Sequence, residues 1–328
     1  MKSITILASE NTAASSIYNP ADLFTSAGRL WHLIQGQKPH PLFQVNIVSQ
    51  NGHPVSCFNG LSVQVHSAMD EIEQTDLILV SSIFDVPKTL PRMKPAVKWL
   101  KQMYQRGTEI GSVCTGAFVL AETGLLNGKH ATTHWGMATA FEKRYPEIRL
   151  DIQKTIIDNG DLYCAGGTNA SLDLTLYLIE KYCGRETALQ CAKVFLHDPG
   201  RNDQTPYTVF SQSFAHADEA IKSSQTWLLD RLHVPVETSE MSKVAGLSLR
   251  TFERRFKKAT GETPLTYVQK LRVESAKHLL ESTQHSFDEI AYQLGYQNTG
   301  AFRKVFVKYT QLLPSVYRNK FKTSPGND

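Results

Sequence analysis

The first half of the chain places its hydrophobic residues in short runs separated by segments with helical spacing. Five apolar or β-branched runs have the length of strands, namely 3–9, 43–49, 76–82, 108–114 and 161–167. Between or after them, apolar residues recur at helical intervals in the stretches 91–105, 115–123 and 168–182. Nearly continuous apolar strands that alternate with helices predict an α/β domain whose parallel sheet has helices on both faces.

This alternation ends at residues 197–217, where Pro, Gly, Asn, Asp and Gln gather in a segment typical of a connector. After Asp218 no strand-like run recurs, and the apolar spacing is helical throughout. We therefore expect an α/β domain, a connector, a separate all-α domain and a short tail, over residues 1–196, 197–217, 218–322 and 323–328.

The predicted all-α domain contains two similar parts. Each part has a short helix, a turn at a glycine (Gly246 or Gly295) and a second helix. Each second helix places two phenylalanines four residues apart on one face, namely Phe252 with Phe256 and Phe302 with Phe306. Both parts therefore predict a helix-turn-helix unit, and the stretch 264–282 predicts one helix between them.

The opposite face of each second helix is polar or basic. In the first unit it carries Arg250, Arg254 and Lys257, and in the second Asn298, Thr299, Arg303 and Lys304. Such a helix fits the major groove of duplex DNA, where Arg pairs with guanine and Asn with adenine. The alternative is a helical bundle with a solvated basic face, which the repeated pattern argues against.

Charge and cysteine content narrow the class of protein. Residues 217–328 contain 17 Lys and Arg against 12 Asp and Glu, whereas residues 1–216 contain 18 against 19. The positive excess therefore lies in the helical part and favours an anionic partner there. The five cysteines include no CxxC pair, so we expect neither a disulfide framework nor a metal site. No apolar run is long enough to span a membrane and no signal peptide is evident, which predicts a cytoplasmic protein.

The stretch from Asp218 to Phe321 resembles the AraC/XylS-type DNA-binding domain. The resemblance rests on "LSLRTFERRFKKATGETPLTYVQKLRVESAKHLL" and "FDEIAYQLGYQNTGAFRKVFVKY…PSVYR". It implies that both second helices enter successive major grooves of an operator. The implied readers of bases are Arg250, Glu253 and Arg254 in the first unit, and Asn298, Thr299, Gly300, Arg303 and Lys304 in the second.

The resemblance also concerns four individual residues in this domain. Lys257 and Lys258 are implied to contact phosphates. Glu253 could accept a hydrogen bond from cytosine or form a salt bridge to a neighbouring arginine. Gln311 departs from the family, which usually has glycine at that turn.

In the first domain, the stretch "GSVCTGAFVLAETG" (111–124) places Cys114 between a predicted strand and a predicted helix. A parallel sheet binds ligands at the carboxyl ends of its strands, where Cys114 lies. The amino end of a helix lowers the pKa of a thiol and offers backbone amides to an anion. A cysteine nucleophile also needs a base, and His134 follows 20 residues later.

Residues 3–195 resemble the ThiJ/PfpI-like, class I glutamine amidotransferase-like fold, which is flavodoxin-like. The motifs are "GSVCTGAFVLAETGLLNGKHATTHW" and "CAGGTNASLDLTLYLIEKYCG". The enzymes of that superfamily have a reactive Cys and a His as partners, and the resemblance places these two residues at Cys114 and His134. Two departures argue against catalysis. The position of the assisting acid falls near Ser15 or Ser16, since Glu10 is too early, and Ser81-Ser82-Ile83 replaces the usual Pro-Gly-Gly.

We therefore expect no catalytic residue and no cofactor. We call the turn from the predicted strand through Cys114 to the predicted helix the elbow, and interpret it as a pocket for a small molecule. The candidate pocket residues are Ser82, Ile83, Cys114, Thr115, His134, Trp135 and Asn169. Trp135 could instead be a core aromatic; within a pocket it could stack on a cationic amine or betaine. Inert packing or oxidation sensing are the other roles open to Cys114.

This order of domains resembles a group of bacterial transcription regulators. The resemblance implies a DNA-binding regulator that senses a small, nitrogen-containing metabolite and forms a homodimer on its operator, with RNA polymerase as a candidate partner. Two alternatives remain open from the sequence. The first domain could be a cysteine-dependent hydrolase or amidase fused to a DNA-binding module, or a dimerisation scaffold without a ligand.

Overall fold

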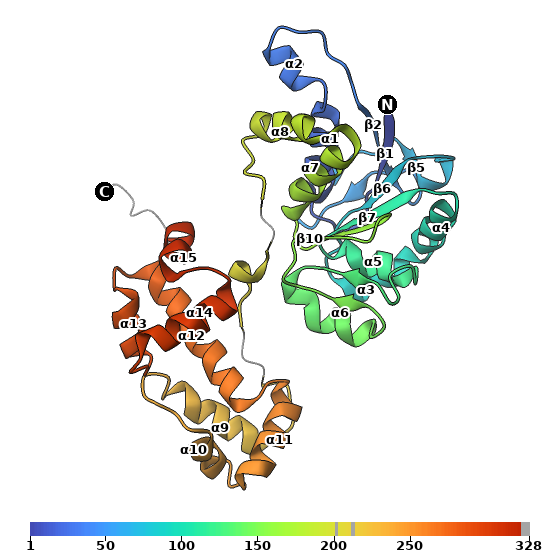
Figure 1. The fold of residues 1–328 in the computed structure, drawn as a ribbon. Helices are drawn as coiled ribbons and strands as arrows, with labels where there is room; N and C mark the ends of the chain where they lie inside the picture. Colours follow the sequence, from blue (N-terminus) through green and yellow to red (C-terminus); the bar gives the residue numbers. More distant parts are fainter. Residues whose placement is uncertain (201–202, 211–213, 323–328) are drawn as a thin grey trace. The chain divides into compact units, whose positions relative to one another are not determined.

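The computed structural model describes residues 1–200, 203–210 and 214–322. The chain divides into two compact units, residues 1–204 and 205–328, and each is described here by itself (Figure 1). The predicted tail 323–328 lies outside the described residues, as do residues 201–202 and 211–213 of the predicted connector.

The first unit is built on a seven-stranded sheet in the order β10-β11-β7-β6-β1-β2-β5. All five runs predicted from the sequence are strands of this sheet, namely β1 (Lys2–Leu7), β2 (Phe43–Ser49), β6 (Leu77–Val80), β7 (Glu109–Val113) and β11 (Leu162–Ala165). The short edge strands are β5 (Ser67–Ala68) and β10 (Ile156–Asp158). Neighbouring strands are parallel except β10 and β11, so the predicted parallel sheet is confirmed apart from one antiparallel edge.

Helices cover both faces of this sheet (Figure 1). One core contains residues of α1 (Ser15–Ser26), α7 (Ala170–Cys183) and α8 (Arg185–Val194), and the other contains residues of α4 (Lys94–Gln105) and α5 (Gly116–Glu122). Successive side chains of a strand point to opposite faces, so Leu77 and Leu79 enter the first core while Ile78 and Val80 enter the second. Burial on both faces explains why these strands are apolar throughout.

Shorter elements complete the first unit. They are the helices α2 (Leu30–Ile34), α3 (Val86–Thr89) and α6 (Ala138–Arg144) and the strands β3 (Val55–Ser56), β4 (Ser62–Val63), β8 (His130–Ala131) and β9 (Arg149–Leu150). Strand β3 pairs with β4, and β8 with β9. The sequence did not predict these elements, because segments of two to seven residues are too short to show a period.

The second unit is helical, as predicted. Its helices are α9 (Glu219–Leu229), α10 (Thr238–Val244), α11 (Leu249–Thr260), α12 (Pro264–Ser282), α13 (Phe287–Gln293), α14 (Thr299–Thr310) and α15 (Pro314–Phe321). The pairs α10–α11 and α13–α14 are the two predicted helix-turn-helix units. Their turn glycines adopt left-handed backbone conformations, with φ of 65° at Gly246 and 75° at Gly295.

Each helix-turn-helix unit has its own core. Phe252 and Phe256 are fully buried in one core, and Phe302 and Phe306 in the other, as their spacing predicted. At the end of α14, Gln311 adopts φ 57°, where the end of α11 has Gly261 at φ 80°. Gln311 Nε2 donates to the Lys308 carbonyl oxygen (3.2 Å). This residue therefore takes the left-handed helix cap that usually belongs to glycine, and the turn is kept.

The described residues were compared with the expectations for disulfides, metal sites and membrane-spanning helices. All five cysteines have free thiols. No group of three or more His, Cys, Asp or Glu among the described residues could hold a metal ion. Within the same ranges, no helix combines the length and the apolar composition that crossing a bilayer requires.

Candidate functional site

Cys114 lies at the turn between β7 and α5 with a left-handed backbone, at φ 55°. This is the strained strand-to-helix turn that presents a side chain at the carboxyl edge of a sheet. The turn needs glycine two residues later. A Cβ on Gly116 would lie 2.6 Å from the carbonyl oxygens of both Val80 and Ser81, so α5 approaches the end of β6 more closely than a side chain permits.

Hydrogen bonds to two neighbouring segments hold this turn. The Cys114 backbone N–H donates to the Ala165 carbonyl oxygen (2.8 Å), and the Cys114 carbonyl accepts from Thr133 Oγ1 (3.0 Å). Near the thiol, Thr168 and Thr115 favour its ionised form. The segments after β7, β8 and β11 are therefore fixed around one cysteine.

The Cys114 thiol is buried, with 6% of the residue exposed. Burial raises the pKa of this thiol above its ordinary value, because the desolvated thiolate is destabilised more than the hydrogen bonds of Thr168 and Thr115 stabilise it. The expectation of a lowered pKa from the helix amino end is therefore wrong. Desolvation outweighs the local backbone amides at this turn.

His134, the predicted partner of Cys114, is half-buried and bonded elsewhere. Its Nδ1 accepts from the Gly136 N–H (3.1 Å), and its ring centroid lies 5.2 Å from that of Trp135. Burial lowers the pKa of His134, which keeps the imidazole neutral at pH 7. Within the described part of the chain, no hydrogen bond joins His134 to Cys114. The structure does not assemble the base with the nucleophile.

A cluster of hydroxyl groups includes Ser16, one of the two residues near which the resemblance placed the missing acid. Ser16 Oγ lies 3.0 Å from Ser82 Oγ and 3.2 Å from Thr12 Oγ1, and all three residues are buried. The carboxylate of Glu10 accepts instead from the Ser56 N–H (3.0 Å). The prediction that Glu10 does not serve Cys114 is therefore consistent with its contacts, and a serine stands near the acid position.

The backbone amides that would bind an oxyanion already donate to side chains. The Ile83 N–H donates to Thr115 Oγ1 (2.9 Å), and Thr115 Oγ1 donates back to the Ile83 carbonyl (2.6 Å). The Ser82 N–H donates to Ser16 Oγ (3.2 Å). An oxyanion site needs free donors directed at the reacting group. This elbow keeps the shape of a nucleophile turn, but the Ser82 and Ile83 amides after β6 are already engaged.

The candidate pocket residues follow the carboxyl ends of β6, β7, β8 and β11 and differ in exposure. Ser82 and Ile83 are fully buried, Cys114 and Thr115 nearly so, His134 and Trp135 are half-buried, and Asn169 is exposed. Trp135 is therefore not a fully buried core aromatic. Sequence reasoning missed Thr133 and Thr168, although each lies beside a residue that it did select.

Iodoacetamide is expected to alkylate Cys114 at pH 7 at least about tenfold more slowly than free cysteine, because the thiolate is scarce and buried. The rate should rise with pH beyond the range in which free cysteine has levelled off, since the pKa is raised. Peptide mass spectrometry would assign the reaction to Cys114, with Cys114→Ala as the control. A rate above that of free cysteine would restore the hydrolase interpretation.

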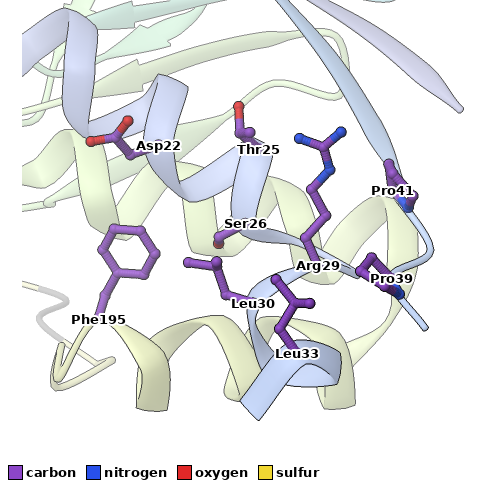
Figure 2. A pocket seen from close by; sticks show the side chains of 9 residues that line it. All are labelled: Asp22, Thr25, Ser26, Arg29, Leu30, Leu33, Pro39, Pro41 and Phe195. Atoms are coloured by element: carbon purple, nitrogen blue, oxygen red, sulfur yellow. The ribbon is translucent and has the colours of Figure 1, made fainter. Parts of the chain in front are cut away.

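A groove of about 660 Å³ lies on the first unit, and Cys114 does not line it (Figure 2). Its lining combines apolar side chains with one acid and one base, namely Asp22, Thr25, Ser26, Arg29, Leu30, Leu33, Pro39, Pro41 and Phe195. None of the seven candidate pocket residues lines it. The groove is large enough for a small molecule, so it is a second location at which ligand binding can be tested.

The outer face of α11 is exposed and basic. All five residues predicted to contact DNA on α11 are exposed, namely Arg250, Glu253, Arg254, Lys257 and Lys258. No ion pair of Arg250, Glu253 or Arg254 occurs among the described residues. By contrast, Arg255 donates to both carboxylate oxygens of Asp218 (2.6 and 2.9 Å). Arg254 is therefore available to an external ligand, whereas its neighbour supports the fold.

On the outer face of α14, unlike that of α11, two of the predicted DNA-contacting residues already form contacts within the protein. Asn298 caps this helix by accepting from the Ala301 N–H (2.9 Å), and Arg303 lies 3.3 Å from Asp288 in an exposed ion pair. Gly300 and Lys304 are exposed, and Thr299 is half-buried. The cap still leaves the NH₂ group of Asn298 to donate to a base, and an exposed ion pair contributes little, so Arg303 can exchange Asp288 for DNA.

Comparison with known proteins agrees with this geometry. A helix-turn-helix domain model matches residues 241–320, and the DJ-1/PfpI family model matches residues 2–181. The HTH-type transcriptional regulator CdhR of Pseudomonas aeruginosa is 29% identical over 296 residues, which cover 88% of this chain and 82% of that protein. The isonitrile hydratase of Pseudomonas putida is 28% identical over 189 residues, 56% of this chain and 81% of the hydratase.

One solved structure supports the fold of the first unit. The crystal structure of an AraC family transcriptional regulator from Pseudomonas putida superposes with a TM-score of 0.51 at 19% identity, over 60% of this chain and all of that chain. At this identity the likeness establishes the fold alone. The match to CdhR is long enough to span both units, whereas the match to the hydratase has fewer residues than the first unit alone.

An α/β domain joined to two helix-turn-helix units defines a DNA-binding transcription regulator, not an enzyme. The chain belongs to the DJ-1/PfpI family, whose model covers more than half of it, and carries an AraC-type helix-turn-helix domain. Both resemblances identified in the sequence are therefore confirmed.

Proposed function

We propose that this regulator reads its operator through the outer faces of α11 and α14. The supporting observation is the exposed basic face of α11. Within the described ranges, Arg250 and Arg254 on this face form no ion pair, whereas the partly buried Arg255 pairs with Asp218. In this proposal Arg250, Glu253 and Arg254 contact base edges in one major groove, and Lys257 and Lys258 contact phosphates. The second groove is read by Asn298, Thr299, Gly300, Arg303 and Lys304.

The first unit, in the same proposal, senses a small nitrogen-containing metabolite at the Cys114 elbow. The elbow, the half-buried pair of His134 and Trp135 and the exposed Asn169 supply the pocket wall. A homodimer would place four helix-turn-helix units on one operator and raise their effective concentration. The dimer would act on RNA polymerase in the cytoplasm.

A thermal-shift screen of the full chain against amino acids, amines, betaines and organic acids tests the sensor. A ligand at 100 times its Kd is expected to stabilise the folded state by about 2.7 kcal/mol. If the elbow is the pocket wall, Cys114→Phe should abolish the shift because the added ring fills the site, while Cys114→Ala should retain a smaller one.

The groove in Figure 2 provides the matched control for that screen. Leu33→Glu changes an exposed side chain of the groove and should leave a ligand shift at the elbow unaltered. A shift that survives Cys114→Phe and disappears in Leu33→Glu would move the sensor site to the groove. If no compound shifts the wild type, the alternative of a dimerisation scaffold gains support.

A further inference from the structure

Gln204 is a buried polar residue next to the candidate site. Only 7% of Gln204 is exposed. Its Nε2 lies within hydrogen-bonding distance of Thr132 Oγ1 (3.0 Å), the Lys154 carbonyl (3.0 Å) and the Thr133 carbonyl (3.2 Å). Its backbone N–H donates to the Gln153 carbonyl (2.7 Å). Part of the predicted connector is thus anchored inside the first unit.

One residue, Thr133, connects Gln204 to the Cys114 elbow by hydrogen bonds. Thr133, whose carbonyl accepts from Gln204, donates its own hydroxyl to the Cys114 carbonyl. Gly166, after β11, makes room for the anchor, since a Cβ there would lie 1.8 Å from Gln204 Nε2. A movement of the segment that carries Thr133 and His134 therefore displaces hydrogen-bond acceptors of Gln204.

The chain that follows Gln204 at once packs on the helical unit. Residues Thr205–Tyr207 form the 3-10 helix η4, which contacts α14. The Tyr207 ring packs edge-on against Phe321, 5.4 Å between centroids, and Lys320 lies over it. Lys277 Nζ donates to the Thr208 carbonyl, and Phe210 packs against Tyr267. We call residues 203–210 the strap.

We propose that the strap couples the occupancy of the Cys114 site to α14, with Gln204 as the positioning residue. One end of the strap is held beside the site, and the other end is held on the helix proposed to read the second major groove. No residue lies between the anchored Gln204 and the 3-10 helix η4, because η4 begins at Thr205. Displacement of Gln204 consequently pulls on η4. This inference rests on the proposed function, because it takes the elbow as the effector site.

Thermodynamic reciprocity makes this coupling measurable without the effector. If a ligand at the elbow changes DNA affinity through the strap, bound DNA must change the affinity of the elbow for that ligand by the same factor. Bound DNA does so by shifting the populations of the conformations of the elbow, and the alkylation rate of a buried thiol follows the population in which it is open. The probe is a duplex selected by the full chain from a random library, and the readout is the iodoacetamide alkylation rate of Cys114. We expect a saturating duplex to change this rate by about fivefold or more in the wild type.

Two variants disconnect opposite ends of the strap. Gln204→Ala removes the anchor on the first unit, and Tyr207→Ala removes the ring contact with Phe321 on the second. In each, the duplex should still bind, but the alkylation rate should no longer respond to it. Gln153→Ala is the matched control, because Gln153 accepts the hydrogen bond of the strap through its backbone carbonyl, which the substitution keeps. This variant should respond as the wild type does.

The outcomes separate this inference from the proposal on which it rests. A bound duplex that leaves the Cys114 rate unchanged in the wild type would overturn the coupling alone. A response that persists in both Gln204→Ala and Tyr207→Ala would also overturn it, even though DNA and elbow were coupled by another route. If the chain selects no duplex, the proposed reading of DNA and the coupling fail together.

Discussion

Replacing Arg254 with alanine is expected to weaken binding to the selected operator by about 1–3 kcal/mol, which is about 5- to 150-fold in Kd. Arg254 lies on the exposed face of α11 and makes no ion pair among the described residues, so its guanidinium is free to bond with a guanine edge. The loss of binding free energy should arise mainly at one base pair of the operator. At that position the variant should distinguish the four bases less well than the wild type does. Fluorescence anisotropy on duplexes substituted one base pair at a time would measure it.

The adjacent Arg255 is the matched control for this prediction. It has the same charge but bonds with Asp218, which also caps α9 by accepting from the Ile221 N–H. Arg255→Ala should lower the melting temperature of the helical unit and leave base preference unchanged. If Arg254→Ala keeps full affinity and an unaltered base preference, or if Arg255→Ala alone relaxes it, the assignment of the reading face of α11 is wrong.

The sequence predicted the sheet and the helix-turn-helix units well because both rest on strong periodic signals. A strand such as β6 is buried on both faces, so every residue from Leu77 to Val80 is apolar and the run is unmistakable. Phe302 and Phe306 mark the inner face of α14 in the same way. The edge strand β10 carries no such signal, because its three residues are only partly buried or exposed.

The chemistry of the elbow could not be read from the sequence, because it depends on contacts between distant segments. The sequence predicted the turn at Cys114 and the absence of an acid at the position near Ser15 or Ser16. It could not reveal that Thr115 occupies the Ile83 amide, or that burial outweighs the helix amino end in setting the pKa of Cys114. Gln204 lies in a segment without any period, and only the fold brings it beside Thr133.

The elbow therefore retains the geometry of a nucleophile turn for a purpose other than catalysis. Its left-handed cysteine and the close approach at Gly116 both cost conformational freedom, yet the base and the free amides are absent from their expected places in the described structure. A rigid turn remains useful to a sensor, since it holds the segments after β6, β7 and β11 at fixed positions around a ligand.

Gly116→Ala is accordingly expected to destabilise the first unit by about 1–3 kcal/mol, the range of an overpacked core position. Alanine has the higher helix propensity, by about 1 kcal/mol, so propensity alone predicts stabilisation of α5. The clash should prevail, because the atoms at 2.6 Å from the new Cβ are the backbone carbonyl oxygens of Val80 and Ser81. Neither oxygen can withdraw without disturbing the end of β6.

Calorimetric unfolding of the full chain would measure this loss, with Gly167→Ala as the matched control. Gly167 also follows a central strand, but a Cβ there meets no atom within 4 Å and its backbone is not left-handed. Its replacement should change stability by less than about 0.5 kcal/mol. Equal melting of the two variants would mean that α5 can move away from β6. The Cys114 turn would then be loose, and its role as a fixed pocket wall would lose its physical basis.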